Sequence, residues 1–189
     1  VVLVNNYLDM DGLVCISADH YGGAVQATEY LCKLGHCKIG LLSGRFSPQV
    51  SEARIEGFVK TLAKYDIPVD DRFIADIEPA LEDGEEIMTR MLRGVDRPTA
   101  FFCTNDTIAA GAMKAVTRAG LRVPEDIAII GFDDSYISRV VEPELTTVRI
   151  DAAKMGCLAM QTLFDLIAGM PVEKAHIQIP TELIVRGTA

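Results

Sequence analysis

The sequence has 189 residues, of which 49% are hydrophobic and 24% charged, and this composition excludes a largely disordered chain. Its 18 basic and 27 acidic residues give a net charge of −9, whereas a surface that binds phosphate groups needs clustered Lys and Arg. We therefore expect this chain to bind nucleic acid poorly by itself. No apolar stretch approaches the roughly 20 residues that span a membrane, so no membrane contact is expected.

The N-terminal residues predict two strands and a helix. Residues 1–4 and 13–17 have strand-like apolar runs, and residues 23–34 form a predicted helix that ends at Gly35 and His36. The chain begins without Met inside the first strand, so we expect that a preceding segment is missing.

The central residues alternate short apolar runs with longer amphipathic segments, as βαβ units do. Predicted strands at residues 38–43, 73–75, 100–103 and 127–132 are separated by predicted helices at 51–65, 81–93 and 106–119. Ser51 and Asn105 are expected to cap the first and third helices, and Gly120 to end the third in a left-handed conformation. This pattern predicts a parallel sheet.

The C-terminal residues predict an extended segment at 142–149, a strongly periodic helix at 152–168, and a closing pair of strands at 176–186 interrupted by Pro180. Together with the N-terminal elements they are expected to contribute to a second lobe.

The cysteine and histidine patterns argue against a disulfide framework and a metal site. The cysteines are odd in number and form no CxxC pair, so we expect reduced core residues of a cytosolic protein. They are Cys15, Cys32, Cys37, Cys103 and Cys157. The histidines lie far apart without ligand spacing, and no phosphate-binding glycine motif occurs, so no metal or cofactor is expected.

Polar residues follow the central strands, at the sheet edge where ligands of parallel α/β proteins bind. Arg54 lies near the start of its helix, where the helix dipole disfavours a cation, so an anion must offset it. One interpretation is that Arg54 and Asp133 face each other and share a polar ligand. The other is a structural ion pair of Arg54 with Glu52, Glu56 or Asp133.

Other polar residues at this edge also have two interpretations. For Asn105 the local sequence favours helix capping without any ligand over a ligand contact. Asp133 is a conceivable catalytic base, but no nucleophile with a partner base accompanies it.

Several motifs together resemble the sensor domain of LacI/GalR-type regulators. They are RPTAFFCTND (residues 97–106), AGLRVPEDI (119–127), GFDD (131–134), PELTTVR (143–149) and PTELIVRGT (180–188), with DHYGGA (19–24) and RIEGF (54–58) nearer the N-terminus. The resemblance extends over essentially the whole chain.

The resemblance implies an α/β fold of the periplasmic-binding-protein-like type I. Such a fold has two parallel-sheet lobes with helices on both faces, and here the first lobe is expected to be incomplete. Residues 1–35 would be the remainder of the N-terminal lobe and residues 36–145 the C-terminal lobe. Residues 146–170 would return to the N-terminal lobe with a helix, and residues 171–189 would supply closing strands of the C-terminal lobe.

The resemblance also assigns ligand-contacting positions, which fall on Arg54, Asn105 and Asp133. Ile77 occupies the position that packs on the ligand ring, where many relatives carry an aromatic residue. Phe46 and Asp19 complete the expected set. Pro48 and Val50 stand where other family members make polar contacts.

The implied function is effector sensing by a dimeric cytoplasmic transcription regulator. A small polar effector, a sugar first and a nucleoside or purine second, would bind between the lobes, and operator DNA would bind only through a missing helix-turn-helix domain. The alternatives are a periplasmic sugar-binding protein of an ABC transporter and, from another class, a small α/β enzyme that uses Asp133.

Two hypotheses concern the whole molecule. Ligand binding is expected to close the lobes, because Arg54 and Asp133 bind the ligand better in the closed state. The chain is also expected to expose apolar faces at residues 1–4, 13–16 and 152–168.

Overall fold

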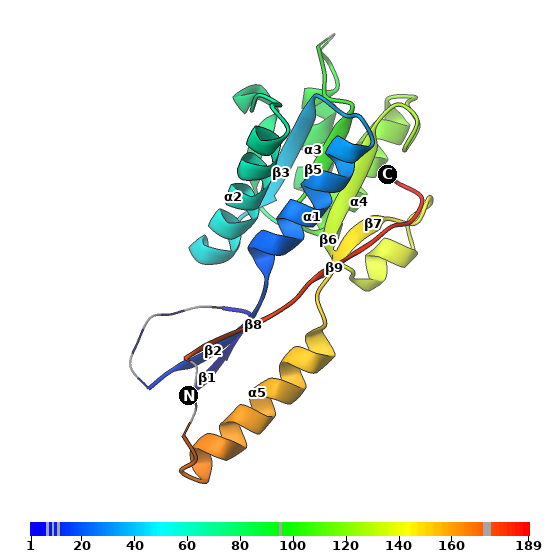
Figure 1. Cartoon of the computed structure of the whole chain (residues 1–189). Helices are drawn as coiled ribbons and strands as arrows, with labels where there is room; N and C mark the ends of the chain where they lie inside the picture. The colour runs from blue at the N-terminus through cyan, green and yellow to red at the C-terminus, as the bar shows by residue number, and fades with distance from the viewer. Residues whose placement is uncertain (7, 9, 11, 95, 172–174) are drawn as a thin grey trace.

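The computed structural model describes residues 1–6, 8, 10, 12–94, 96–171 and 175–189. These residues form a larger and a smaller lobe, with the N-terminus in the smaller lobe and the C-terminus in the larger (Figure 1). The chain passes between the lobes after β2, after β7 and after β8, so three crossing segments join them.

A six-stranded sheet in the order β4-β3-β5-β6-β7-β9 forms the centre of the larger lobe. Neighbouring strands from β4 to β7 pair in parallel, and β9 pairs antiparallel with β7. The strands are β3 (Ile39–Gly44), β4 (Ile74–Ile77), β5 (Ala100–Cys103), β6 (Ala128–Asp133), β7 (Thr146–Arg149) and β9 (Glu182–Ile184). β3, β5 and most of β6 are buried, as expected for strands covered on both faces.

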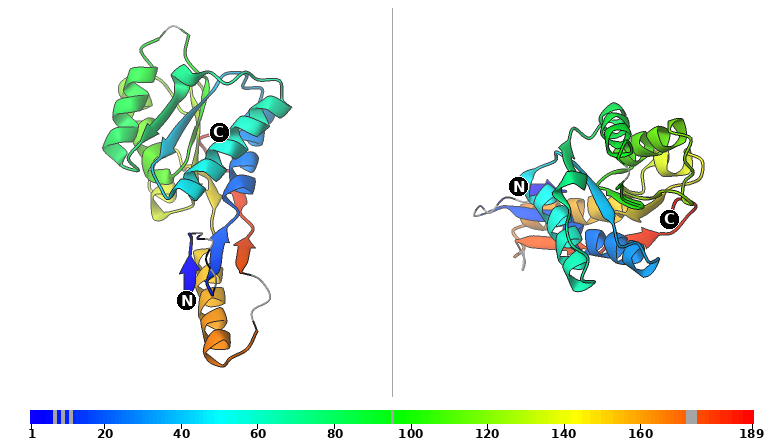
Figure 2. Two further views of the ribbon diagram at one scale, coloured as in Figure 1. Left: turned by 90° about the vertical axis from the view of Figure 1, so that its left-hand side faces the viewer. Right: turned by 90° about the horizontal axis from the view of Figure 1, so that it is seen from above.

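Two helix pairs cover the two faces of this sheet (Figure 2). α1 (His20–Lys33) packs against α2 (Pro48–Lys64) over one face, and α3 (Leu81–Met91) packs against α4 (Asp106–Arg118) over the other. Side chains along a strand alternate between the two faces. Accordingly Leu41 belongs to the apolar cluster under α1 and α2, and Leu42 to the cluster under α3 and α4.

The smaller lobe contains a parallel sheet in the order β1-β2-β8, against which α5 packs. Its elements are β1 (Val2–Val4), β2 (Val14–Ala18), α5 (Ala152–Ile167) and β8 (His176–Ile179). Met155 and Ala159 of α5 pack against Ile16 and Ile179 of the sheet. Two short 3-10 helices, η1 (Asp71–Phe73) and η2 (Tyr136–Arg139), lie in loops of the larger lobe.

The lobes divide the chain differently from the expected ranges 1–35, 36–145, 146–170 and 171–189. α1 was assigned to the N-terminal lobe but covers the larger sheet. β7 also pairs within the larger sheet, and β8 pairs with β2 in the smaller one. The reason is that amphipathic periodicity shows that a helix has a buried face, but not which sheet that face covers.

Local expectations have mixed outcomes. Asn105 caps α4 and Gly120 has a φ of +73°, as predicted. The predicted cap at Ser51 is wrong, because α2 begins earlier, with Ser47 at the cap position and Pro48 in its first turn. Two cysteines are also not core residues, since Cys37 and Cys157 are exposed.

The expected exposure of apolar residues holds for two of the three segments. Val1 is 75% exposed, and Phe164 and Ile167 on α5 are 59% and 74% exposed. Residues 13–16 are instead buried, because β2 is the central strand of the smaller sheet. Among the described residues, no helix is long and apolar enough to cross a membrane.

Candidate functional site

Asp133 lies at the edge of the larger sheet that faces the crossing segments. It is the last residue of β6 and stands opposite Arg149, the last residue of the parallel strand β7. From the end of β7 the chain passes into α5 of the smaller lobe. The carboxyl end of β6 therefore lies where the two lobes meet, which is the ligand-binding edge of parallel α/β sheets.

Arg54 and Asp133 form the ion pair that was one of the predicted arrangements. Arg54 Nη2 lies 3.3 Å from Asp133 Oδ1, and the side chain of Arg54 is 3% exposed against 38% for Asp133. Glu56, another predicted partner, instead pairs with Lys60. The arrangement places a buried cation behind a carboxylate that faces the junction.

The guanidinium of Arg54 contacts several protein groups. Its Nη1 donates to the carbonyl oxygen of Thr104, and its Nη2 donates to Nδ1 of His20 at 3.2 Å as well as to Asp133. The rings of Phe132 and Phe46 lie 3.9 Å and 5.1 Å from its central carbon, close enough for cation–π contact. These contacts fix the guanidinium and, through it, the carboxylate of Asp133.

Burial raises the pKa of Asp133 to about 6, although the charge of Arg54 acts in the opposite direction. The buried carboxylate of Asp106 adds to the rise. Asp133 can therefore change its charge in a mildly acidic solution, whereas an ordinary aspartate cannot.

His20 belongs to this site, and the sequence analysis missed it. It is the first residue of α1, is 5% exposed, and accepts hydrogen bonds from Arg54 through Nδ1. Periodicity predicts that the helix begins at residue 23, and residues 1–35 are expected in the N-terminal lobe. His20 therefore falls outside the set of groups that follow the strands of the larger sheet. The same strand-end argument, applied to the strand at residues 13–17, points to it.

The remaining predicted site residues differ in how close they lie to the pair. Phe46 is near, since its ring contacts Arg54. Asn105 and Asp19 cap α4 and α1, accepting from the backbone nitrogens of Ile108 and Gly22 at 2.8 Å each. Ile77 is 6% exposed and packs in the core cluster under α3 and α4.

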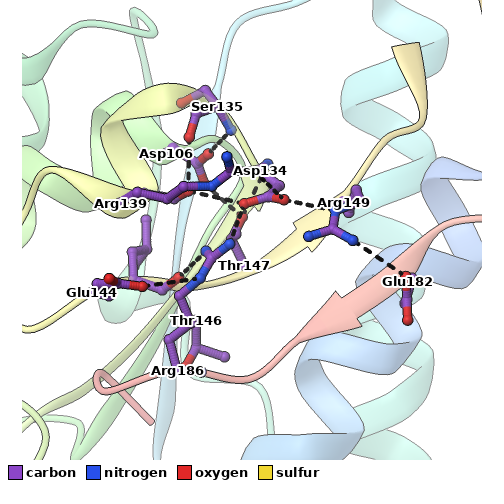
Figure 3. A network of polar contacts seen from close by, with 12 residues as sticks. Asp106, Asp134, Ser135, Arg139, Glu144, Thr146, Thr147, Arg149, Glu182 and Arg186 are labelled. Carbon is purple, nitrogen blue, oxygen red and sulfur yellow. Dashed lines mark hydrogen bonds and ion pairs between the residues drawn. The ribbon is translucent and has the colours of Figure 1, made fainter. Parts of the chain in front are cut away.

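Asp134, which directly follows β6, is held by a network of polar contacts (Figure 3). Its side chain is 2% exposed and pairs with Arg186 at 2.6 Å, Arg149 at 2.7 Å and Arg139 at 3.4 Å. Burial raises its pKa, but hydrogen bonds from Arg186, Arg149 and Ser138 outweigh this effect and bring the pKa to about 2. Asp134 therefore remains ionised and ties β6 to β7, η2 and the C-terminal segment.

A cavity of about 130 Å³ lies between the smaller sheet and the N-terminal ends of α1 and α2. The side chains that line it are mostly polar, and His20 is one of them. The others include Ser17, Tyr21, Gln49, His176 and Gln178. Within the described part of the chain, no group of three or more His, Cys, Asp or Glu side chains is placed to hold a metal ion.

Comparisons with known proteins agree on one family. A family model described as "Periplasmic binding protein-like domain" matches residues 28–189. The chain is 37% identical over 166 residues to the HTH-type transcriptional repressor PurR of Mannheimia succiniciproducens, covering 88% of this chain and 50% of the relative.

Solved structures give the same result. A regulatory protein of the LacI family from Chloroflexus aggregans has a TM-score of 0.92 at 31% identity, over 99% of this chain and 67% of that chain. A complex of the transcriptional regulator CelR with cellobiose also has a TM-score of 0.92, at 26% identity, over 100% of this chain and 58% of the other.

The two lobes, their crossing strands and the matching family model define a periplasmic-binding-protein-like domain. Within that class, the chain belongs to the LacI family of transcriptional regulators. The relatives reported above are regulators and not enzymes. The chain spans about half the length of the curated relatives that it matches.

Proposed function

We propose that this chain is the effector-sensing part of a LacI/GalR-type DNA-binding transcription regulator. The effector is a small polar molecule that binds at the junction of the lobes, over Asp133. The regulator acts in the cytoplasm as a homodimer, and operator DNA is bound by a helix-turn-helix domain, the element for which the "HTH-type" relatives are named. The charge of −9 on this chain is consistent with DNA contact elsewhere.

The observation that carries this proposal is the Arg54–Asp133 pair. Arg54 is buried and donates to Asp133, His20 and Thr104, so it holds Asp133 in place and leaves the outer part of that carboxylate for a ligand. Asn105 has its side-chain oxygen engaged in the cap, so its amide nitrogen is the group that it offers.

We propose a sugar as the first effector class and a nucleoside or purine as the second. Neighbouring hydroxyl groups both donate and accept, which suits a carboxylate beside polar side chains and the partly exposed Phe46 ring. The structural neighbour bound to cellobiose supports the first class.

A thermal-shift screen tests the proposal. The protein in its full natural length is screened against sugars, sugar phosphates and nucleosides, beside Asp133→Ala and the matched control Glu86→Gln, which removes an exposed carboxylate on α3. We expect at least one compound to raise the Tm of the wild-type protein and of Glu86→Gln, but not of Asp133→Ala. An equal response of all three proteins would show that the effector does not bind at Asp133.

Effector binding is proposed to close the lobes. The closed state brings the smaller lobe against Asp133 and adds contacts that the open state lacks, so the effector shifts an existing equilibrium. Small-angle scattering of the protein with and without the compound found above should show a smaller radius of gyration in the complex. An unchanged scattering curve would contradict closure.

A further inference from the structure

His20 has a ring nitrogen that the ion-pair network does not use. The residue is 5% exposed, and its Nδ1 accepts hydrogen bonds from Nη2 and Nε of Arg54 at 3.2 Å and 3.4 Å. Its Nε2 is buried and has no hydrogen-bond partner among the residues that the structure describes. Buried polar atoms without a partner are rare in native proteins.

Arg54 determines which nitrogen of His20 carries the proton. A guanidinium only donates hydrogen bonds, so Nδ1 must be unprotonated, and the proton of the neutral ring must then be on Nε2. Burial, with Arg54 adding to it, lowers the pKa of His20 to about 3, so the ring stays neutral at physiological pH. Nε2 is therefore a hydrogen-bond donor without an acceptor.

His20 is also one of the residues that line the 130 Å³ cavity between the lobes. Ser17 and Gln178 line the cavity from the smaller sheet, and Gln49 lines it from α2. A cavity of this size, lined by both apolar and polar atoms, can admit a group of several atoms from a bound molecule. The residue that carries the unused donor therefore also lines space that a ligand can fill.

We propose that His20 is a specificity-determining contact of the effector site, and that its Nε2–H donates to a hydroxyl or carbonyl oxygen of the effector. This inference rests on the proposed function and deepens it. His20 Nδ1 and Asp133 Oδ1 share one atom, Arg54 Nη2, so a single small molecule can reach both residues. The effector then offers an acceptor to His20 and a donor to Asp133, as the hydroxyl groups of a sugar do.

Two substitutions separate the two nitrogens of the ring. His20→Asn keeps a short acceptor for Arg54 near the position of Nδ1 but has no atom at the position of Nε2. His20→Gln can place an amide N–H near the position of Nε2 but loses the acceptor for Arg54. His36→Asn is the matched control, because His36 lies beyond the opposite end of α1 and contacts Thr99.

Calorimetric titration of the full-length protein with cellobiose, D-glucose, D-ribose and adenosine tests the inference. For a compound that binds the wild-type protein, we expect His20→Asn to raise Kd at least about tenfold, since an effector oxygen loses its partner. His20→Gln should recover part of this loss, and His36→Asn should bind like the wild type. Nitrogen NMR of the histidine rings should show the Nε2–H tautomer of His20 before any ligand is added.

The other possible outcomes contradict the inference, and each shows which part of it is wrong. Unchanged binding by His20→Asn, together with lost binding by Asp133→Ala, removes His20 from the site and leaves the proposed function intact. Unchanged binding by both His20→Asn and Asp133→Ala would remove both residues from the effector site, and with them the proposed site itself. An Nδ1–H tautomer overturns the donor role, and failure of all four compounds to bind at 10 mM overturns the inference together with the proposed effector classes.

Discussion

Asp133 and Asp134 both have positive φ angles, 108° and 51°, which residues other than glycine rarely adopt. Such conformations persist where surrounding contacts hold them, and they concentrate at functional sites. Here Arg54 holds the side chain of Asp133, and three arginines hold that of Asp134. The two residues thus have different roles. Asp134 fixes the backbone that follows β6, and Asp133 presents its carboxylate at the junction of the lobes.

The pH dependence of effector binding should come from Asp133. Its pKa in the free protein is raised to about 6, and a bound effector that donates to the carboxylate favours the ionised form. Below pH 6 the carboxyl must lose a proton before it binds, so the affinity should fall by up to about tenfold per pH unit as the pH decreases. Above pH 6 the affinity should be constant.

Calorimetry between pH 5 and pH 8 measures this effect. His20 stays neutral over the range because its pKa is lowered to about 3, so it adds no second inflection. Asp133→Asn should bind more weakly and show no inflection near pH 6. An inflection that persists in this variant would assign the titration to another group.

Removal of the buried carboxylate of Asp134 should strongly destabilise the larger lobe. In Asp134→Asn the side chain of Arg186, which is 11% exposed, loses the nearer of its two charged partners and keeps only the exposed Glu144. Breaking a buried ion pair on one side costs about 3 kcal/mol or more. Urea unfolding should show this loss, whereas Glu56→Gln, which breaks the exposed pair with Lys60, should cost less than about 0.5 kcal/mol. Equal effects of the two variants would contradict the anchoring role of Asp134.

At the scale of elements, α3 and α4 are packed closely enough to require glycine at their contact. A Cβ atom added at Gly111 of α4 would lie 2.1 Å from the carbonyl oxygen of Leu81 at the start of α3. It would also lie 2.9 Å from the backbone nitrogen of Glu85. Both contacts are with backbone atoms, so the helices must move apart. We expect Gly111→Ala to lower the free energy of unfolding by about 1 to 3 kcal/mol.

Gly156 of α5 is the matched control, because a Cβ atom there meets nothing within 4 Å. Alanine favours a helix over glycine by about 1 kcal/mol, so Gly156→Ala should stabilise the protein slightly. Chemical denaturation of both variants gives the comparison. A destabilisation of similar size in both would mean that the α3–α4 contact is not the cause.

The elements themselves were largely predictable from the sequence, but their partners were not. The order of strands and helices follows from periodicity and turn residues, and the strand-end argument brought Arg54 and Asp133 together correctly. That argument missed His20 because α1 was given to the wrong lobe, and contacts between elements distant in the chain have no local signal. Ile77 is a second example. Its position after a predicted strand does not show whether its side chain faces the ligand or the core, and in the structure it packs in the core under α3 and α4.

At the scale of the whole molecule, the two lobes differ in how completely they are covered. The larger sheet has helices on both faces, whereas α5 turns one face to the smaller sheet and the other to solvent. Met160, Phe164 and Ile167 are 51%, 59% and 74% exposed and are spaced four and three residues apart, so they share one face of the helix. Contiguous exposed apolar side chains of this kind are unusual on a monomeric protein.

The isolated chain should therefore bind a hydrophobic dye through α5. We expect strong dye fluorescence from the 189-residue chain, because the exposed face of α5 offers a continuous apolar surface. The double substitution Phe164→Lys and Ile167→Lys should remove most of the fluorescence without loss of fold, since neither side chain is buried. Val69→Ser, a single exposed position in a loop, should leave the fluorescence unchanged. A monomeric chain with low dye binding would show that this face of α5 is covered in solution. A double variant as bright as the wild type would show that the dye binds elsewhere.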